Sequence, residues 1–311
     1  MKKTLTALTA ISVLLAPAAL AESKAFSAKP FSKIEVKGVM DVVYKDGAET
    51  KVTVETPSGD FSDALIMNEG DTLVVTRESL QKKRSFFSWG GSTDISHDGD
   101  TIKVNGKRVP RYTVYVTGPD LESVQVSQSS TFDGKAIDAG DLAVSASSSS
   151  KAKLAGTSGE THLSASSSGE VYAKELKAKV LDISASSSGE ATGTVTGTGE
   201  TMIDASSSGE ATVYSTSAAS FNVNASSGGS VELSGACSSI EVSASSGAEV
   251  DGDDLHCKSA NASASSGAEV DLHATDYAKG HASSGGDVSF SGAAGEQKMS
   301  ESSGGSVRFT N

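Results

Sequence analysis

Residues 163–171 read Leu-Ser-Ala-Ser-Ser-Ser-Gly-Glu-Val, and close copies of this phrase begin at Ile183 and Ile203. Altered copies extend the pattern over residues 144–309. Each copy has an anchor residue before its serine pair, and the anchors are Ala146, Ala165, Ala185, Ala205, Ala225, Ala244, Ala264, Ala282 and Glu301. Successive anchors lie 18 to 20 residues apart. A nearly fixed period of this length is typical of a repeat architecture.

Apolar and polar residues alternate within each copy. Around the anchor Ala225, for example, Val223, Val231 and Leu233 are apolar, whereas Glu232 between the last two is charged. A period of two places successive side chains on opposite faces of a strand, whereas a helix requires a period near 3.6. The sequence therefore predicts an all-β fold, a right-handed parallel β-solenoid (β-helix) of about ten coils with a β-rich N-terminal capping section.

The core of this solenoid is expected to be thin near the anchors. Alanine at the anchor and serine two places later leave room for little more than a methyl or a hydroxyl group. A buried hydroxyl group needs a hydrogen-bond partner, so we expect these serines to stack and bond to one another or to the backbone. A disordered serine-rich linker is the alternative, and the register of the apolar columns argues against it.

Residues 1–21 have the features of a secretory signal peptide. Lys2 and Lys3 precede a short apolar run, and Ala19-Leu20-Ala21 has the small-x-small pattern of a cleavage site. The run is too short to span a bilayer as a helix, and we expect no transmembrane segment after signal removal. This interpretation predicts export to the periplasm or to the outer cell surface of a Gram-negative bacterium.

The rest of the chain divides into a β-rich N-terminal section, residues 22–118, and the repeat solenoid, residues 119–311. The two are expected to form one continuous domain over residues 22–311. In the N-terminal section, strand candidates are separated by turn signals, and Asn105-Gly106 is typical of a tight hairpin. Asp63–Met67 is the one stretch there that fits a turn of helix.

Residues 81–91 combine the single tryptophan of the chain with two phenylalanines and three consecutive cations. The aromatic residues are Phe86, Phe87 and Trp89. They can form an exposed contact loop that stacks on sugar rings or touches a partner. They can also pack onto the cap as core residues, which is the commoner fate of aromatic side chains.

The chain carries a formal net charge of −13, and removal of the signal lysines makes it more negative. An acidic exported protein is a poor candidate for binding nucleic acid or an anionic membrane. We therefore expect its partner to be an envelope or cell-surface component, with a glycan as one candidate. The oligomeric state stays open.

An acidic residue occupies the fifth place after the anchor in most copies. These residues, with one serine among them, are Glu170, Glu190, Glu210, Ser230, Glu249, Glu269 and Asp287. They are expected to face outward on coils about 4.8 Å apart, where two carboxylates in water repel each other by roughly 1 kcal/mol. The column is either a solvated charged edge or a ladder that binds cations. Calcium is the candidate ion, and no other cofactor is expected.

Cys237 and Cys257 lie 20 residues apart, each seven residues before the next anchor. Stacked coils would place them on adjacent rungs, within reach of a disulfide bond. An exported chain with an even number of cysteines favours that bridge over free thiols. The histidines are scattered and match no metal-binding spacing along the chain.

The segment Tyr112–Ser130, Tyr-Thr-Val-Tyr-Val-Thr-Gly-Pro-Asp-Leu-Glu-Ser-Val-Gln-Val-Ser-Gln-Ser-Ser, resembles the entry to the repeats of a bacterial family. That family is the head GIN domain of putative auto-transporter adhesins. Residues 31–42 resemble its opening, and the recurring Ser-Gly-Glu-Val and Ser-Ser-Gly phrases resemble its coils. The resemblance covers nearly the whole mature chain. It implies a β-solenoid of the bacterial envelope with a conjectured adhesive role, and it assigns no catalytic residues.

These observations favour a non-catalytic exported envelope protein that serves as an adhesion or surface- and glycan-binding module. We expect no enzyme activity, because no arginine lies between Arg111 and Arg308 and the short bends could hardly build a cleft. Two alternatives stay open. One is a carbohydrate-active enzyme, a polysaccharide lyase or hydrolase, and the other is a periplasmic structural protein without a ligand.

Overall fold

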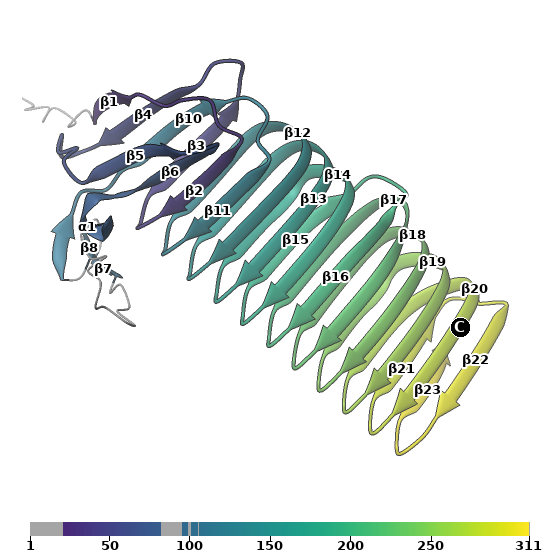
Figure 1. Cartoon of the computed structure of the whole chain (residues 1–311). Coiled ribbons are helices and arrows are strands. Elements are labelled where there is room, and N and C mark those ends of the chain that lie inside the picture. The colour runs from purple at the N-terminus through teal and green to yellow at the C-terminus, as the bar shows by residue number, and fades with distance from the viewer. Residues whose placement is uncertain (1–20, 82–94, 99–100, 105, 311) are drawn as a thin grey trace, which may run out of the picture.

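The computed structural model describes residues 21–81, 95–98, 101–104 and 106–310. Most of this chain is β-strand, and it forms a parallel β-solenoid of about nine coils, against about ten expected from the repeat. The coils follow one another along a single axis, from the N-terminal strands at one end to β22 (Glu296–Glu301) and β23 (Ser306–Thr310) at the other (Figure 1). The predicted fold class is confirmed. In the described part of the chain, no helix has the length and apolarity needed to cross a bilayer.

Each coil contains one long bent strand, or two shorter strands where the bend interrupts it. The strands pair in parallel and in register, so that Ala165 lies between the anchors Ala146 and Ala185 of the neighbouring coils. The other strands of the coils are β12 (Thr131–Ser147), β13 (Lys151–Ser166), β14 (Glu170–Ser186), β15 (Glu190–Val195), β16 (Glu200–Ser206), β17 (Glu210–Ser226), β18 (Ser230–Ser245), β19 (Glu249–Ser265), β20 (Glu269–Ser283) and β21 (Asp287–Ser291).

The repeated serines form a tight turn between consecutive strands. Between β13 and β14, Ser167 and Ser168 have backbone φ angles of 51° and 59°. The N–H of Gly169 donates to the carbonyl oxygen of Ser166 at 2.8 Å, which closes the pattern of a type I′ turn. The N–H of Ser168 also donates to the carbonyl oxygen of Ser187 in the next coil at 3.2 Å. The turns are therefore hydrogen-bonded to one another along the stack.

The expected column of buried serines is wrong, because the second serine after each anchor is exposed. Its left-handed backbone conformation belongs to the turn and directs the side chain to solvent. In every copy but the last, the small buried positions are the alanine anchor and the place four residues later, which holds glycine, alanine or serine. At Gly169, a Cβ atom would lie 2.2 Å from the carbonyl oxygen of Ala146. The backbone of the preceding coil therefore limits the size of the side chain that can occupy this place.

The apolar columns fill the wider part of the core, and the predicted alternation is confirmed. Val231 and Leu233 are buried, whereas Glu232 between them is exposed. Near the C-terminal end of the stack, Phe290 and Phe309 lie on adjacent coils with their ring centroids 5.2 Å apart. Large side chains thus stack on their counterparts from coil to coil, as the repeat requires.

The N-terminal section extends the sheet beyond the first coils. Its elements are β1 (Glu22–Phe26), β2 (Lys33–Lys37), β3 (Asp41–Asp46), β4 (Lys51–Thr56), β5 (Ala64–Glu69), β6 (Thr72–Arg77), α1 (Glu78–Gln81), β7 (Ile95–Asp98), β8 (Thr101–Val104), β9 (Lys107–Val109), β10 (Thr113–Gly118) and β11 (Ser123–Ser127). Strand β2 pairs in parallel with β11, and β3 pairs in parallel with β10 and β12. These pairings cover the edge that the first coil would otherwise expose.

Two local predictions in this section have opposite outcomes. The hairpin is confirmed by its strands, because β8 and β9 pair antiparallel with Val104 opposite Lys107, whereas Asn105 lies outside the described residues. The helical turn at Asp63–Met67 is wrong, because this stretch enters β5 and pairs antiparallel with β6. Sheet pairing overrides the weak local preference for helix. The helical turn follows β6 instead, where the N–H of Ser79 donates to Asp63 Oδ1 at 2.8 Å.

Candidate functional site

The acidic residues at the fifth place form a continuous column on the outside of the coils, which we call the acidic column. Each follows a serine turn and pairs with the same place in the next coil. From Lys151, the pairing runs through Glu170, Glu190, Glu210, Ser230, Glu249, Glu269 and Asp287. None of these described side chains is buried, so the predicted outward orientation is confirmed. The predicted binding of an ion stays a prediction.

The acidic column is paired with cations at its two ends. Lys151 forms an ion pair with Glu170, and Arg308 Nη2 lies 3.0 Å from Asp287 Oδ1. Inside the column, burial raises the pKa of the Glu190 carboxyl, and the charges of Glu170 and Glu210 raise it further. Repulsion between neighbouring carboxylates is thus present in the folded chain. A bound cation would relieve it.

A second outward column of carboxylates runs beside the first on β19 and β20. Asp251 pairs with Asp271 as Glu249 pairs with Glu269, so two neighbouring strands present four carboxylates. We call these four residues the carboxylate patch. Burial raises the pKa of the Asp271 carboxyl group. The negative charges of Asp253, Glu269 and Asp251 raise it further. The patch therefore concentrates negative charge within two coils.

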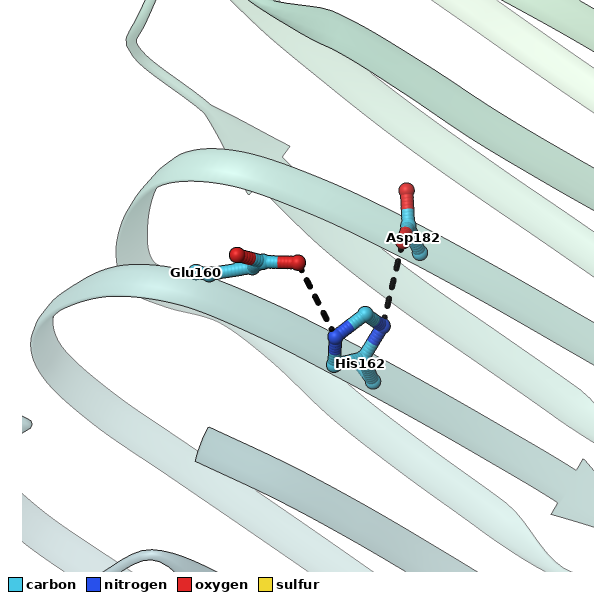
Figure 2. Close-up of side chains that lie close together, drawn as sticks. All are labelled: Glu160, His162 and Asp182. Atoms are coloured by element: carbon cyan, nitrogen blue, oxygen red, sulfur yellow. Dashed lines mark ion pairs between the residues drawn. The ribbon is translucent and has the colours of Figure 1, made fainter. Parts of the chain in front are cut away.

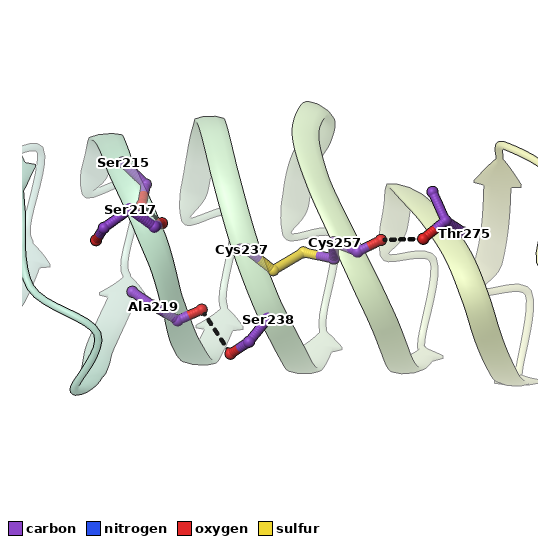
Figure 3. Close-up of a disulfide and its surroundings, with 7 residues drawn as sticks. All are labelled: Ser215, Ser217, Ala219, Cys237, Ser238, Cys257 and Thr275. Carbon is purple, nitrogen blue, oxygen red and sulfur yellow. Dashed lines mark hydrogen bonds between the residues drawn. A yellow bond between two sulfur atoms is a disulfide. The ribbon is translucent and has the colours of Figure 1, made fainter.

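The predicted disulfide bond between Cys237 and Cys257 is confirmed. The two residues pair in register on β18 and β19, their Cα atoms lie 4.5 Å apart, and both are buried. Figure 3 shows the bond crossing from one coil to the next. On one side of it, Thr275 Oγ1 donates to the carbonyl oxygen of Cys257 at 3.5 Å. On the other side, Ser238 Oγ donates to the carbonyl oxygen of Ala219 at 3.0 Å.

Two predicted features lie outside the described residues. One is the signal peptide, apart from Ala21, and the other is the aromatic group Phe86, Phe87 and Trp89. Both assignments stay predictions.

The structure brings together a cluster that the spacing along the chain does not reveal, formed by Glu160, His162 and Asp182 (Figure 2). His162 Nε2 lies 3.2 Å from Glu160 Oε1, and His162 Nδ1 lies 3.1 Å from Asp182 Oδ2. Asp182 comes from the next coil, so only the repeat period could have indicated the contact. His162 and Asp182 each lie three residues before an anchor, at Ala165 and Ala185. We call these three residues the histidine cluster.

The fold and its outer surface define a class of protein, the all-β solenoids that present regular charged columns to solvent. The family model for "Putative auto-transporter adhesin, head GIN domain" matches residues 30–216 and 192–294. The chain belongs to this family, as the resemblance predicted. No curated protein matches the chain. The family and the disulfide bond indicate an extracytoplasmic surface module.

Several solved bacterial structures are similar to the chain at low sequence identity. A putative lipid binding protein from Parabacteroides distasonis is 14% identical, with 94% of this chain and 97% of that chain covered and a TM-score of 0.47. A putative adhesin from Parabacteroides merdae is also 14% identical, with 94% and 96% covered and a TM-score of 0.41. Both TM-scores are below 0.5, so the assignment rests on the family match.

Proposed function

We propose that the protein is an exported binding module that attaches to envelope or cell-surface material, with a glycan as the leading candidate. It acts in the periplasm or on the outer surface of a Gram-negative cell. The observation that carries this proposal is the acidic column, which presents an outward carboxylate on successive coils, with Ser230 as the one interruption. A repeated group at the spacing of adjacent strands suits a polymeric ligand, because each coil can make the same contact.

Calcium supplies the chemistry that joins such a column to an anionic or hydroxyl-rich glycan. Ca²⁺ takes about six to eight oxygen ligands from carboxylates, carbonyls, hydroxyls and water. In the carboxylate patch, Glu249 and Glu269 lie on adjacent coils beside Asp251 and Asp271. The patch supplies part of such a shell, and the oxygen atoms of a glycan complete it.

Co-sedimentation with outer-membrane fragments tests this function. The chain without its signal peptide, residues 22–311, is mixed with fragments of Gram-negative outer membrane in calcium or in chelator. We expect it to sediment with the fragments in calcium and to be released by the chelator. The double variant Glu249→Gln and Glu269→Gln, which keeps size but removes charge, is expected to sediment less. Glu241→Gln is the matched control, because Glu241 is exposed on β18 in another column.

The other outcomes contradict the proposal in distinct ways. A chain that stays in solution under both conditions has no affinity for envelope material, which favours a structural role. Sedimentation that is unchanged by chelator and by the double variant places the contact away from the acidic column. Release of reducing ends from the fragments indicates a carbohydrate-active enzyme instead.

A further inference from the structure

We propose that the histidine cluster is a site for a divalent transition-metal ion of the zinc type. It is separate from the acidic column, because Glu160 and His162 precede the serine turn whereas Glu170 follows it. Among the described residues, it is the one group of three His, Cys, Asp or Glu side chains whose ligand atoms all lie within 4.8 Å of one another. The proposal does not depend on the adhesive function.

The two contacts of the imidazole ring carry the argument. Each ring nitrogen of His162 faces a carboxylate oxygen, Nε2 toward Glu160 and Nδ1 toward Asp182 (Figure 2). A neutral imidazole has one N–H group and one lone pair, so it can donate to only one of them. The other nitrogen then directs its lone pair at a carboxylate. A cation between that nitrogen and the carboxylate removes this conflict.

Asp182 is held in position to accept a hydrogen bond from Nδ1 of His162. The backbone N–H of Met202 donates to Asp182 Oδ1 at 3.2 Å, which leaves Oδ2 directed at His162 Nδ1. Histidines that bind metal through one nitrogen commonly donate the other N–H to a carboxylate, which fixes the tautomer and the ring orientation. We therefore assign Nε2 of His162 and the carboxylate of Glu160 as metal ligands, with Asp182 as the positioning residue.

The surroundings of the cluster are acidic and open. Asp141 is the strand partner of Glu160 on the preceding coil, where it can contribute a further oxygen ligand. A groove of about 420 Å³ lies beside the cluster, and its lining includes His162 with the carboxylates of Asp120, Glu122 and Asp141. Carboxylates around the groove raise the local concentration of cations. Water or the oxygen atom of a ligand in the groove completes the coordination.

The imidazole selects the class of metal. Imidazole nitrogen suits zinc, copper, iron and nickel, whereas calcium and magnesium prefer shells made of oxygen. The histidine cluster is therefore expected to take Zn²⁺ in preference to Ca²⁺. Calcium remains the candidate ion for the acidic column. A doubly protonated His162 that donates to both carboxylates without metal is the rival arrangement.

Isothermal titration calorimetry of residues 22–311 with Zn²⁺ tests the assignment. The chain carries no polyhistidine tag and is stripped with chelator beforehand. We expect one saturable zinc site that His162→Asn abolishes and that an excess of Ca²⁺ does not displace. Asp182→Asn is expected to weaken binding about 10- to 100-fold, the usual effect of removing a group that orients a ligand.

Two controls make the result specific. His281→Asn removes an exposed histidine whose strand neighbours are Ser263 and Ser300, so it should leave the affinity unchanged. The ring protons of His162, followed by NMR, should shift on addition of zinc in the wild type and in the His281 variant. Absence of saturable binding overturns the proposal. Zinc binding that survives His162→Asn also overturns the proposal. If a His256→Asn variant then loses zinc binding, the ion lies instead at His256 and His273, whose rings are in contact with each other.

Discussion

Single residues in the turns carry a conformational cost that other copies of the repeat avoid. Ser168 has a φ angle of 59°, a region that costs an L-residue about 1–2 kcal/mol. Glycine adopts this conformation without a steric penalty. It occupies the same place in later copies, at Gly228, Gly247, Gly267, Gly285 and Gly304. The serines of the earlier copies are therefore tolerated rather than required.

Replacing Ser168 with glycine should stabilise the protein. We expect Ser168→Gly to raise the free energy of unfolding by up to about 1 kcal/mol, because relief of the left-handed strain exceeds the added entropy of the unfolded chain. Ser166→Gly, whose φ angle is not positive, should lower it by about 0.5–1 kcal/mol. Urea denaturation followed by circular dichroism measures both. Equal effects of the two variants would contradict the role of the turn geometry.

Asp271 should make stability depend on pH in a defined direction. Burial, with the charges of Asp253, Glu269 and Asp251, raises its pKa above the usual 3.8. The folded chain then holds this proton more tightly than the unfolded chain, so the contribution of Asp271 to stability falls as pH rises through the raised pKa. We expect Asp271→Asn to stabilise the protein at neutral pH, with a gain that shrinks as the pH falls through the raised pKa of Asp271.

The control for this prediction is Asp254→Asn, which changes an exposed aspartate on the neighbouring strand β19. Chemical denaturation at a series of pH values gives the free energy of unfolding of each variant. A gain for the Asp271 variant that does not change with pH would show that the charge of Asp271 is not its cause.

At the scale of the strand, the bends of the coils depend on close approach between backbones. The pairing of β12 with β13 shifts register between Gly134 and Ile137, and Gly156 of β13 lies opposite Ile137. Gly156 has a φ angle of 139°, and a Cβ atom there would lie 2.0 Å from the carbonyl oxygen of Ile137. Gly235 has the same relation to Ser215, at 1.9 Å. Glycine at such a bend lets two coils keep their spacing while the strand changes direction.

Gly156→Ala should therefore destabilise the stack. We expect a loss of about 2–3 kcal/mol in the free energy of unfolding, because the methyl group forces both the backbone conformation and the neighbouring carbonyl group to shift. Gly140→Ala is the matched control, since a Cβ atom at Gly140 meets nothing within 4 Å and its φ angle is not positive. Thermal unfolding by circular dichroism compares the two. A similar fall in both midpoints would contradict the argument.

At the scale of the whole molecule, stability depends on contacts between neighbouring coils, and one covalent bond reinforces them. The disulfide bond closes a loop with a sequence separation of 20 residues. We expect the double variant Cys237→Ala and Cys257→Ala to lose about 3 kcal/mol in the free energy of unfolding. Calorimetry with and without a reducing agent measures this loss. Reductant should destabilise the wild type and leave the double variant unchanged, and a wild type that does not respond would contradict the expectation.

The sequence predicted the features that depend on the period of the repeat. The stacking of Ala146 on Ala165 and the pairing of Cys237 with Cys257 follow directly from a regular step along the chain. The contact of His162 with Asp182 has the same origin, but it joins two coils and does not show in the spacing of metal ligands along one strand. A pattern of alternating side chains does not fix a backbone dihedral angle, so the left-handed Ser167 could not be inferred from it. Asp63–Met67 became a strand because of its partner in β6, which is a tertiary effect.

The bridge between Cys237 and Cys257 also determines how the molecule lengthens under load. A solenoid pulled at its two ends releases stored length one coil at a time, and 20 released residues extend by at most roughly 70 Å. In the bridged coil, tension passes across the two sulfur atoms, and the chain between them stays slack. Unravelling that passes this point therefore gains no length from the bridged residues unless the bond is reduced.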